Sequence, residues 1–313
     1  MTKDARIAAA LLIPVVVGAL FSLVRFALEG SDVPRDEDYD AALAVIVEQG
    51  YDRGLDAVAV MPPWSLRASQ HLRTLSLISA DLLHERPLHR YRRLFLVVEP
   101  DAGRWLRPLL DTLGAPSQEQ DAGRVDVLTF ELAGPRVTYD FRERLFDAVV
   151  EIGDVSGAPE PKALCDRRSD RGWSCPSRPS WQRVTRQHLL VSENGDDALW
   201  VHPPPRGEEL ILSYANVELG DVLVLRAGHT REGVDRAKAP VVVRVLVADQ
   251  EVARVERDVR FHFRTDVIDT SRFHGQRADV AFRIHTENNG SNHFAIDAYA
   301  ARGAPRDVEG GAP

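Results

Sequence analysis

The spacing of apolar residues changes along the chain and separates two kinds of structure. Between about residues 36 and 135, short apolar runs alternate with segments in which apolar residues recur every three or four positions. Leu94–Val98 is the clearest run, and the segment after it places Trp105, Leu109 and Leu113 on one helical face. The expected elements are helices over about 38–50, 66–73 and 101–113, and strands over about 56–60, 75–78, 94–98 and 125–132.

Strands that alternate with helices form parallel sheets whose two faces are covered. Residues 36–135 therefore predict a small Rossmann-like α/β domain. Ligands of such domains bind beyond the carboxyl ends of the strands. Trp64 follows one strand at this edge, and Glu99 and Asp101 follow another. The first candidate site therefore lies there.

From about residue 137 the pattern is that of β-strands. Over residues 241–248, valines alternate with positions that include Arg244, so that one face is apolar throughout. Glycine and proline interrupt such segments about every ten residues. The spacing predicts a β-sandwich or jelly roll over residues 137–302, followed by a disordered tail over 303–313. The expected strands are 137–141, 148–152, 188–191, 199–202, 209–214, 221–227, 241–248, 251–257, 260–266, 279–286 and 293–299.

The first thirty residues contain the longest apolar run of the chain. Ile7–Val24 holds 18 residues without a charge, with Lys3 and Arg6 before it and Arg25 after it. This pattern predicts a transmembrane anchor over residues 7–28 with a cytoplasmic N-terminus. A cleaved signal peptide is the alternative, although Leu28-Glu29-Gly30 is a poor cleavage site.

The two cysteines of the chain give information on the cellular compartment of the protein. Cys165 and Cys175 lie in a polar segment with nine residues between them. An even cysteine count in an exported protein favours a disulfide. The alternative is a metal site, but neither a His nor a third Cys lies between the two cysteines. We therefore expect a disulfide, and no metal or cofactor.

Composition narrows the function classes. The net charge is -8 and the isoelectric point about 5.7, which argues against a nucleic-acid partner because phosphate binding needs a basic face. Arginine greatly outnumbers lysine, and Ala, Val and Gly are abundant. We read this bias as that of a GC-rich bacterial genome. With the predicted anchor it places the protein in the bacterial inner membrane, single-pass, with its body in the periplasm.

Four residues near the predicted strand ends are the candidate binding residues. Trp64 and Trp105 can stack on a sugar ring or pack as core. Glu99 and Asp101 can act as an acid/base pair, or Asp101 can cap the helix while Glu99 faces solvent. The sequence carries neither G-x-G-x-x-G, nor a P-loop, nor G-x-S-x-G, so we assign no catalytic residue.

Residues 200–297 carry an ordered set of features. They are Trp200-Val-His-Pro, LILSYANVELGDVLVL over 210–225, the alternating segment 240–247, Asp266-Val-Ile-Asp-Thr-Ser271 and His293-Phe-Ala-Ile-Asp297. This order resembles the galactose-binding-like jelly rolls found as carbohydrate-binding modules. The resemblance implies a sandwich that can carry a structural calcium and an aromatic sugar platform. Asp269 and residues 287–292 offer oxygens that suit calcium, but Asn289-Gly290 also suits a hairpin turn.

An anchored α/β domain followed by such a jelly roll is also similar in style to the extracytoplasmic parts of bacterial membrane glycosyltransferases. The leading hypothesis is a non-catalytic envelope protein that binds a glycan or a protein partner. Loops 229–239 and 287–292 are the expected glycan contact surface in the sandwich. The alternatives are an enzyme or accessory subunit in envelope polysaccharide processing, and a structural subunit of a membrane complex.

Overall fold

The computed structural model describes residues 33–53, 55–78, 80, 83, 88, 90–132, 136–157, 161–189, 196–260 and 263–303. The predicted anchor over residues 7–28 and all of the predicted tail 303–313 except residue 303 lie outside the described residues. Within the described part, no helix has both the length and the hydropathy that crossing a bilayer requires.

Contacts divide the chain into two compact units, which are described one at a time. The first comprises the described residues up to 52 together with 58–77 and 95–130. The second comprises 53–57, 78–94 and the residues from 131 onward. Segment 78–94 therefore groups with the β-sandwich, although its sequence places it within the predicted α/β domain.

A four-stranded sheet in the order β1-β2-β4-β3 forms the α/β layer. Hydrogen bonds at both ends of β1 and β2, from Arg92 N to Leu55 O and from Glu99 N to Met61 O, run in the parallel sense. β3 and β4 pair antiparallel. The elements are α2 (Asp36–Glu48), β1 (Asp56–Met61), α3 (Leu66–His71), β2 (Arg93–Val98), the 3-10 helix η1 (Pro100–Ala102), α4 (Gly103–Leu113), β3 (Gln118–Ala122) and β4 (Val125–Glu131).

The predicted all-parallel, Rossmann-like sheet is therefore not the sheet that forms. After α4 the chain enters β3 and returns through a tight turn at Gly123, whose φ of 74° suits glycine. β3 was missed because its sequence, QEQDA, is polar and mostly exposed at the sheet edge. The predicted strand at 75–78 is reduced to a single parallel bridge between Val58 and Leu77.

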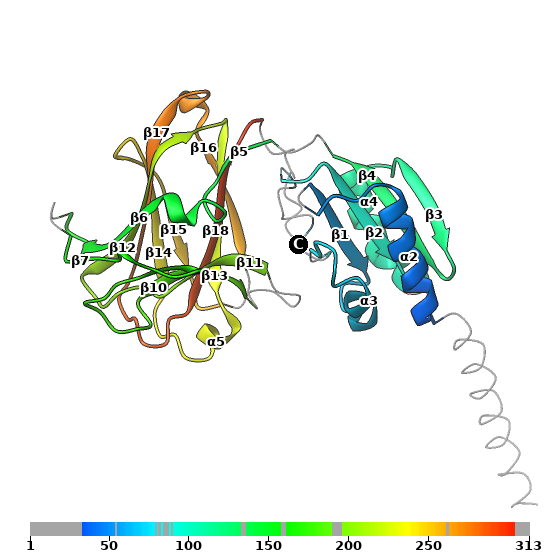
Figure 1. The fold of residues 1–313 in the computed structure, drawn as a ribbon, viewed down its shortest axis with the longest axis horizontal. Helices are drawn as coiled ribbons and strands as arrows, with labels where there is room; N and C mark the ends of the chain where they lie inside the picture. The colour runs from blue at the N-terminus through cyan, green and yellow to red at the C-terminus, as the bar shows by residue number, and fades with distance from the viewer. Residues whose placement is uncertain are drawn as a thin grey trace, which may run out of the picture. The chain divides into compact units, whose positions relative to one another are not determined.

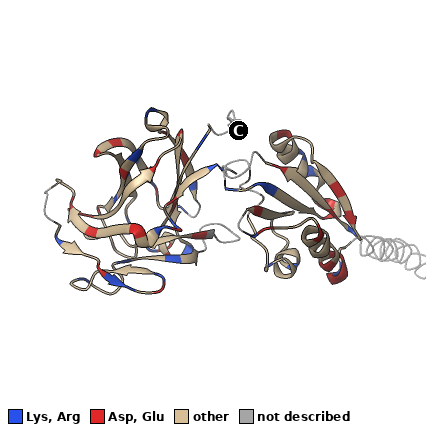
Figure 2. Cartoon of the chain, turned by 45° about the horizontal axis from the view of Figure 1, so that its top comes forward, with Lys and Arg blue, Asp and Glu red and all other residues tan. Residues whose placement is uncertain are grey.

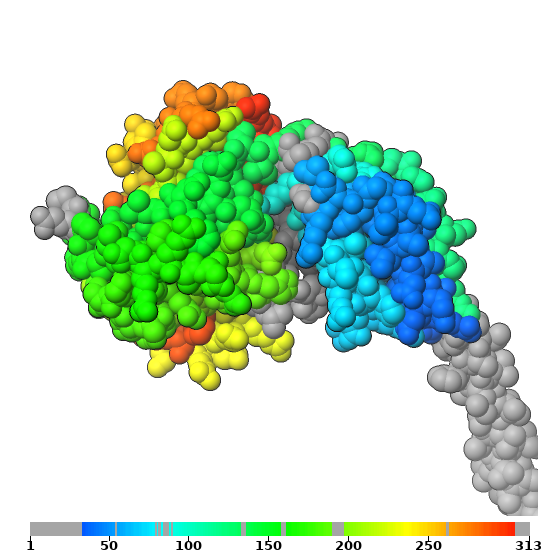
Figure 3. Space-filling view, viewed as in Figure 1, coloured from blue at the N-terminus to red at the C-terminus, as the bar shows by residue number. Residues whose placement is uncertain are grey.

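One face of this sheet carries α2 and α3 (Figure 1). Tyr39, Ala42 and Ile46 of α2 pack in one core cluster with Val58 and Phe95 from the strands. The surfaces of α2 and of the segment around α3 lie side by side in Figure 3. The first turn of α2 is acidic, as Figure 2 shows, which suits the positive end of the helix dipole.

The second unit is a β-sandwich, as the alternation predicts (Figure 1). One sheet has the order β16-β13-β18-β11-β10-β9-β8 with β5 paired to β18, and the other has the order β15-β14-β17-β12-β6-β7. The strands are β5 (Val137–Asp140), β6 (Ala148–Asp154), β7 (Ala163–Leu164), β8 (Arg167–Arg168), β9 (Gly172–Ser174), β10 (Arg183–Leu189), β11 (Asp196–Val201), β12 (Glu208–Glu218), β13 (Val222–His229), β14 (Val241–Val247), β15 (Gln250–Arg257), β16 (Arg264–Asp269), β17 (Arg277–Thr286) and β18 (Phe294–Ala301). Short helices are η2 (Leu145–Asp147), α5 (Arg231–Val234) and η3 (Ser271–Phe273).

The sandwich core follows the predicted alternation. Val241, Val243 and Val245 of β14 are fully buried and meet Phe282 and Ile284 of β17 between the two sheets. The intervening positions of β14 point away from this core, because side chains alternate along a strand. The outer face of β14 is therefore the one that carries Arg244.

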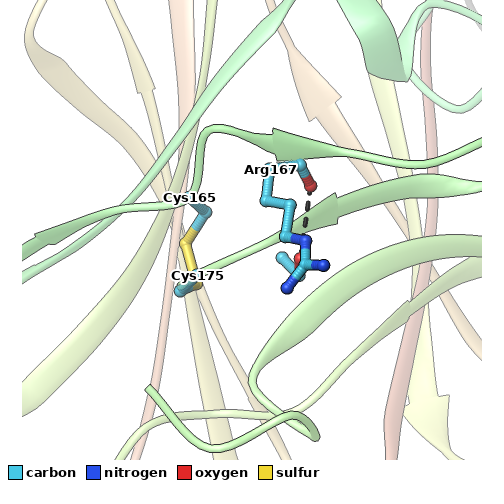
Figure 4. Close-up of a disulfide and its surroundings, with 4 residues drawn as sticks. Cys165, Arg167 and Cys175 are labelled. Carbon is cyan, nitrogen blue, oxygen red and sulfur yellow. Dashed lines mark hydrogen bonds between the residues drawn. A yellow bond between two sulfur atoms is a disulfide. The ribbon is translucent and has the colours of Figure 1, made fainter. Parts of the chain in front are cut away.

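The predicted disulfide is confirmed: Cys165 and Cys175 are bonded. Both are buried in the sandwich core, and they bracket β8 and β9 (Figure 4). The hydroxyl of Ser174 donates to the Arg167 carbonyl within this hairpin. β8 and β9 are too short and polar to show a strand pattern in the sequence.

A buried charge cluster explains why segment 78–94 groups with the sandwich. Arg90 forms ion pairs with Asp140 and, at 2.8 Å, with Asp297. Its guanidinium also lies 4.4 Å from the centre of the Tyr299 ring. Asp297 is 2% exposed and lies 3.4 Å from Arg226. Burial lowers the pKa of Arg90, and the charge of Asp297 opposes that effect.

Candidate functional site

The structure brings two of the predicted binding residues into contact. Trp64 follows β1, and Trp105 lies in the first turn of α4. Their ring centres are 5.0 Å apart and their planes meet at 84°. Trp64 is 52% exposed and Trp105 42% exposed, so the two indoles form a surface rather than a core contact. We call these two residues the tryptophan pair.

An arginine side chain contacts the tryptophan pair, and an exposed leucine lies near it in the sequence. The Arg104 guanidinium lies 4.9 Å from the Trp105 ring centre, which suits a cation–π contact. Leu66, the first residue of α3, is 73% exposed and follows Trp64 by two positions. Ser65 caps α3: its hydroxyl accepts from Ala68 N at 3.4 Å.

Glu99 is bound by side chains from two other elements. The hydroxyls of Tyr39 and Ser65 both donate to Glu99 Oε1 at 2.5 Å. Burial, followed by the hydrogen bond to Glu99, raises the pKa of Tyr39. Glu99 thus ties α2 and the start of α3 to the end of β2, rather than facing solvent without a partner.

Asp101 differs from the predicted helix cap. α4 begins at Gly103, its N-terminal flanking residue is Ala102, and no side chain caps it. Asp101 instead lies inside η1, because Pro100 leads the chain directly into a 3-10 turn. It is exposed, and within the described residues it forms no hydrogen bond or ion pair. Glu99 and Asp101 thus occupy different environments, one bonded to two hydroxyls and the other open to solvent.

A second aromatic group lies on the sandwich and was not predicted. Trp181 is 38% exposed, and its ring centre lies 4.5 Å from that of His202. His202 and Trp200 lie 5.7 and 5.6 Å from His293, respectively. Trp200 and His202 are two residues apart, and this spacing could have indicated that they share one face of the chain.

The two loops expected to contact glycans lie beside this aromatic group. Glu232, in loop 229–239, has its carboxylate 3.8 Å from His293 Nδ1. The backbone N–H of Thr230 donates to the His293 carbonyl at 3.1 Å. Loop 287–292 leads directly into His293. The contacts therefore bring loop 229–239 and the end of loop 287–292 together at His293, one member of this aromatic group.

A pocket of about 450 Å³ opens elsewhere on the sandwich. Its lining is polar and consists of Asp170, Arg171, Arg186, Gln187 and His188. None of the four predicted site residues lines it. Within the described residues, no group of three or more His, Cys, Asp or Glu side chains is arranged to hold a metal ion.

No family model matches the chain, and no curated protein matches it either. Solved structures with a similar fold include a CBM51-2 module with GlcNAc and INT domains from Clostridium perfringens ZmpB, at 16% identity and a TM-score of 0.27. This similarity covers 37% of the present chain and 26% of that one.

Two further structures are single modules. The CBM51 module of Clostridium perfringens GH95, in complex with methyl-galactose, shares 13% identity over 37% of this chain and 87% of its own, with a TM-score of 0.28. The xylan-binding module CBM15 shares 12% identity over 49% of this chain and 98% of its own, with a TM-score of 0.27. All three structures contain carbohydrate-binding modules. Because the TM-scores are low, we base no argument on these structures and take the ligand chemistry from the chain's own residues.

Proposed function

We propose that this protein is a non-catalytic glycan-binding protein of the bacterial envelope. The observation that carries the proposal is the tryptophan pair. Exposed aromatic side chains in contact with each other offer apolar area that a ligand can bury. An indole face can stack on the apolar face of a sugar ring, and the second indole, set at 84°, can flank the ring edge.

The surroundings of the pair supply hydrogen-bonding groups. Arg104 holds its guanidinium at the Trp105 ring, where its N–H groups can donate to sugar hydroxyls. Asp101 is exposed four residues before Trp105 and can accept from hydroxyls. Glu99 accepts two hydroxyl hydrogen bonds on one oxygen, which hold its carboxylate in place. This arrangement favours a positioning role for Glu99 over that of a general acid.

Leu66 favours a second candidate function, the docking of a protein partner. It is 73% exposed and follows Trp64 by two positions in the sequence, so a protein partner could bury it together with the tryptophan pair. Protein interfaces use such clusters of aromatic and aliphatic side chains as their energetic centres. The two functions differ in whether Leu66 contributes to binding.

The location is also part of the proposal. An anchor over residues 7–28 would hold the body of the protein outside the cytoplasm, as the charge pattern around the apolar run suggests. The bond between Cys165 and Cys175 supports an oxidising compartment. In a bacterium with two membranes, that compartment is the periplasm.

Substitution of the tryptophan pair tests the glycan proposal. Wild type, Trp64→Ala and Trp105→Ala are compared on a glycan array, and the affinities for the retained glycans are then measured. Loss of one stacked indole should weaken binding about tenfold, or roughly 1.4 kcal/mol. Trp64→Phe should retain part of the affinity, because an aromatic face remains.

Two controls separate the candidate functions. Val149→Ala removes an exposed apolar side chain from the sandwich and should leave glycan binding unchanged. Leu66→Ser should also leave glycan binding unchanged, whereas it should weaken a protein complex centred on the same patch. Absence of any glycan signal for the wild type, or equal affinities of wild type and both Trp→Ala variants, would refute the proposal.

A further inference from the structure

Three arginines form a row across neighbouring strands on the outer face of one sandwich sheet. The antiparallel register places Arg244 of β14 opposite Arg254 of β15 and, on its other side, opposite Arg283 of β17. Val243 and Ile284, the sequence neighbours of Arg244 and Arg283, belong to the core between the sheets. The three guanidinium side chains therefore extend from the opposite face. We call them the arginine row.

Such a row costs stability, because like charges directly opposite each other on a sheet repel. Two carboxylates offset part of this repulsion. Glu209 of β12 is fully buried and lies 2.9 Å from Arg283 Nη1 and 3.8 Å from Arg244 Nη1. Glu251 accepts from Arg244 Nε at 2.7 Å. Arg244 and Arg283 are therefore held in position by their partners.

Arg254, at the end of the row, is different. It is exposed, and within the described residues it forms no ion pair or hydrogen bond. Glu256 lies two positions along β15 on the same face, but it makes no ion pair in the described part of the chain. The positive charge of Arg254 is thus available to a ligand.

Three polar atoms beside the row also lack a hydrogen bond. Glu209 Oε2, Arg283 Nε and His285 Nδ1 are buried without a hydrogen bond in the described structure. Glu209 is 0% and His285 8% exposed. His285 is paired with Val242 of β14, two residue pairs from the row and on the same face of the sheet. Burial lowers the pKa of His285, and the charges of Arg254 and Arg244 lower it further, so the row creates a positive local potential.

We propose that the arginine row binds an oxyanion, a carboxylate or sulfate ester, carried by the glycan. Guanidinium groups present forked N–H donors that match such oxyanions in a bidentate manner. Arg244 and Arg283 are oriented in advance by Glu209, and Arg254 supplies the charge that no neighbour neutralises. The inference rests on the proposed function in one respect: the oxyanion is taken to be part of the glycan that the protein binds. It adds that the polymer is acidic and that the sandwich binds it apart from the tryptophan pair.

Three polymers with one backbone test the inference: dextran, carboxymethyl-dextran and dextran sulfate. Binding of the full-length protein to each is measured by affinity electrophoresis at low and high salt. We expect retardation by at least one charged polymer, weakening with salt because the row is solvent-accessible. Arg254→Glu should reduce that affinity at least tenfold. Comparison of the affinities for carboxymethyl-dextran and dextran sulfate shows which oxyanion the protein prefers.

A control variant on β17, the strand of Arg283, matches the charge change of Arg254→Glu. Arg277 of β17 is 57% exposed and faces the same side as Arg283, six residues or about 20 Å away. Arg277→Glu should leave binding of the charged dextrans unchanged. Arg254→Gln removes the charge without reversing it and should give an intermediate loss, and thermal unfolding of each variant checks the fold.

The outcomes distinguish this inference from the proposed function. Equal losses of affinity for the charged dextrans in Arg254→Glu and Arg277→Glu would show unspecific charge attraction. They would overturn the proposal that the arginine row binds the oxyanion. Equal binding of dextran and both charged polymers by the wild type would also overturn it. Trp64→Ala on the glycan array tests the proposed function by itself, so either can fail while the other stands.

Discussion

Three histidines of the sandwich are buried. His202, His229 and His285 are 7%, 0% and 8% exposed. Burial is the largest cause that lowers the pKa of each from 6.5, because the charged imidazolium loses its hydration. Hydrogen bonding to the Pro203 carbonyl partly opposes this effect at His202. The folded protein therefore keeps these side chains neutral at pH values where the unfolded chain protonates them.

Stability should consequently fall when the pH drops below 6.5. Between pH 6.5 and the lowered pKa values of the folded protein, the three histidines are protonated in the unfolded chain but neutral in the folded one. The unfolded state therefore binds more protons, and a lower pH favours unfolding. The free energy of unfolding, measured by denaturant titration between about pH 7.5 and pH 5.5, should decrease by up to about 1.4 kcal/mol per pH unit for each histidine.

His285→Gln should reduce that slope, because one of the three proton acceptors is removed. The pH range of the measurement ends at about 5.5 because Glu209 has the opposite effect on stability at lower pH. Burial raises the pKa of Glu209 above its ordinary value of 4.5, so just above that pH the folded state binds its proton more readily than the unfolded chain does. A free energy of unfolding that stays constant over this range would show that the histidines are not kept neutral by the fold.

At the scale of elements, the disulfide closes the hairpin of β8 and β9. Cys165 precedes β8 and Cys175 follows β9, and both side chains lie in the sandwich core. The bond joins residues ten positions apart, so it restricts a short loop in the unfolded chain. Trp173, between them, donates from Nε1 to the Leu145 carbonyl at 3.0 Å and so ties the hairpin to η2.

Removal of the disulfide should destabilise the protein by about 2–3 kcal/mol, the loop-closure entropy of so short a ring. The double variant Cys165→Ala, Cys175→Ala is compared with wild type by thermal unfolding, with and without reductant. Reductant should lower the melting temperature of the wild type and leave that of the variant unchanged. A wild type insensitive to complete reduction, verified by thiol counting, would contradict the expected contribution.

At the scale of the whole molecule, the prediction concerns the cellular location of the protein. The proposed anchor over residues 7–28 should keep the full-length protein in the inner-membrane fraction through alkaline washing, because about 20 apolar residues suffice to span the bilayer. Membrane fractionation followed by N-terminal sequencing of the mature protein provides the measurement. A soluble periplasmic product that begins after about residue 30 would identify the segment as a cleaved signal peptide instead.

The sequence determined the parts of this protein that depend on local periodicity. Alternation along 241–247 predicted the buried face of β14, and helical spacing predicted α2 and α4. The even cysteine count, with the prediction that the chain is exported, indicated the disulfide. These follow because the face that a side chain occupies is fixed by its own strand or helix. The candidate residues Trp64 and Trp105 also came from their positions beside predicted strands.

Only the tertiary structure decided how those elements pair. Periodicity carries no information on strand direction, so the polar edge strand β3 and the antiparallel half of its sheet were missed. The contact of Trp64 with Trp105, the binding of Glu99 by Tyr39 and the arginine row each join residues that are distant in sequence. Such contacts depend on register and packing between elements, which no single segment encodes.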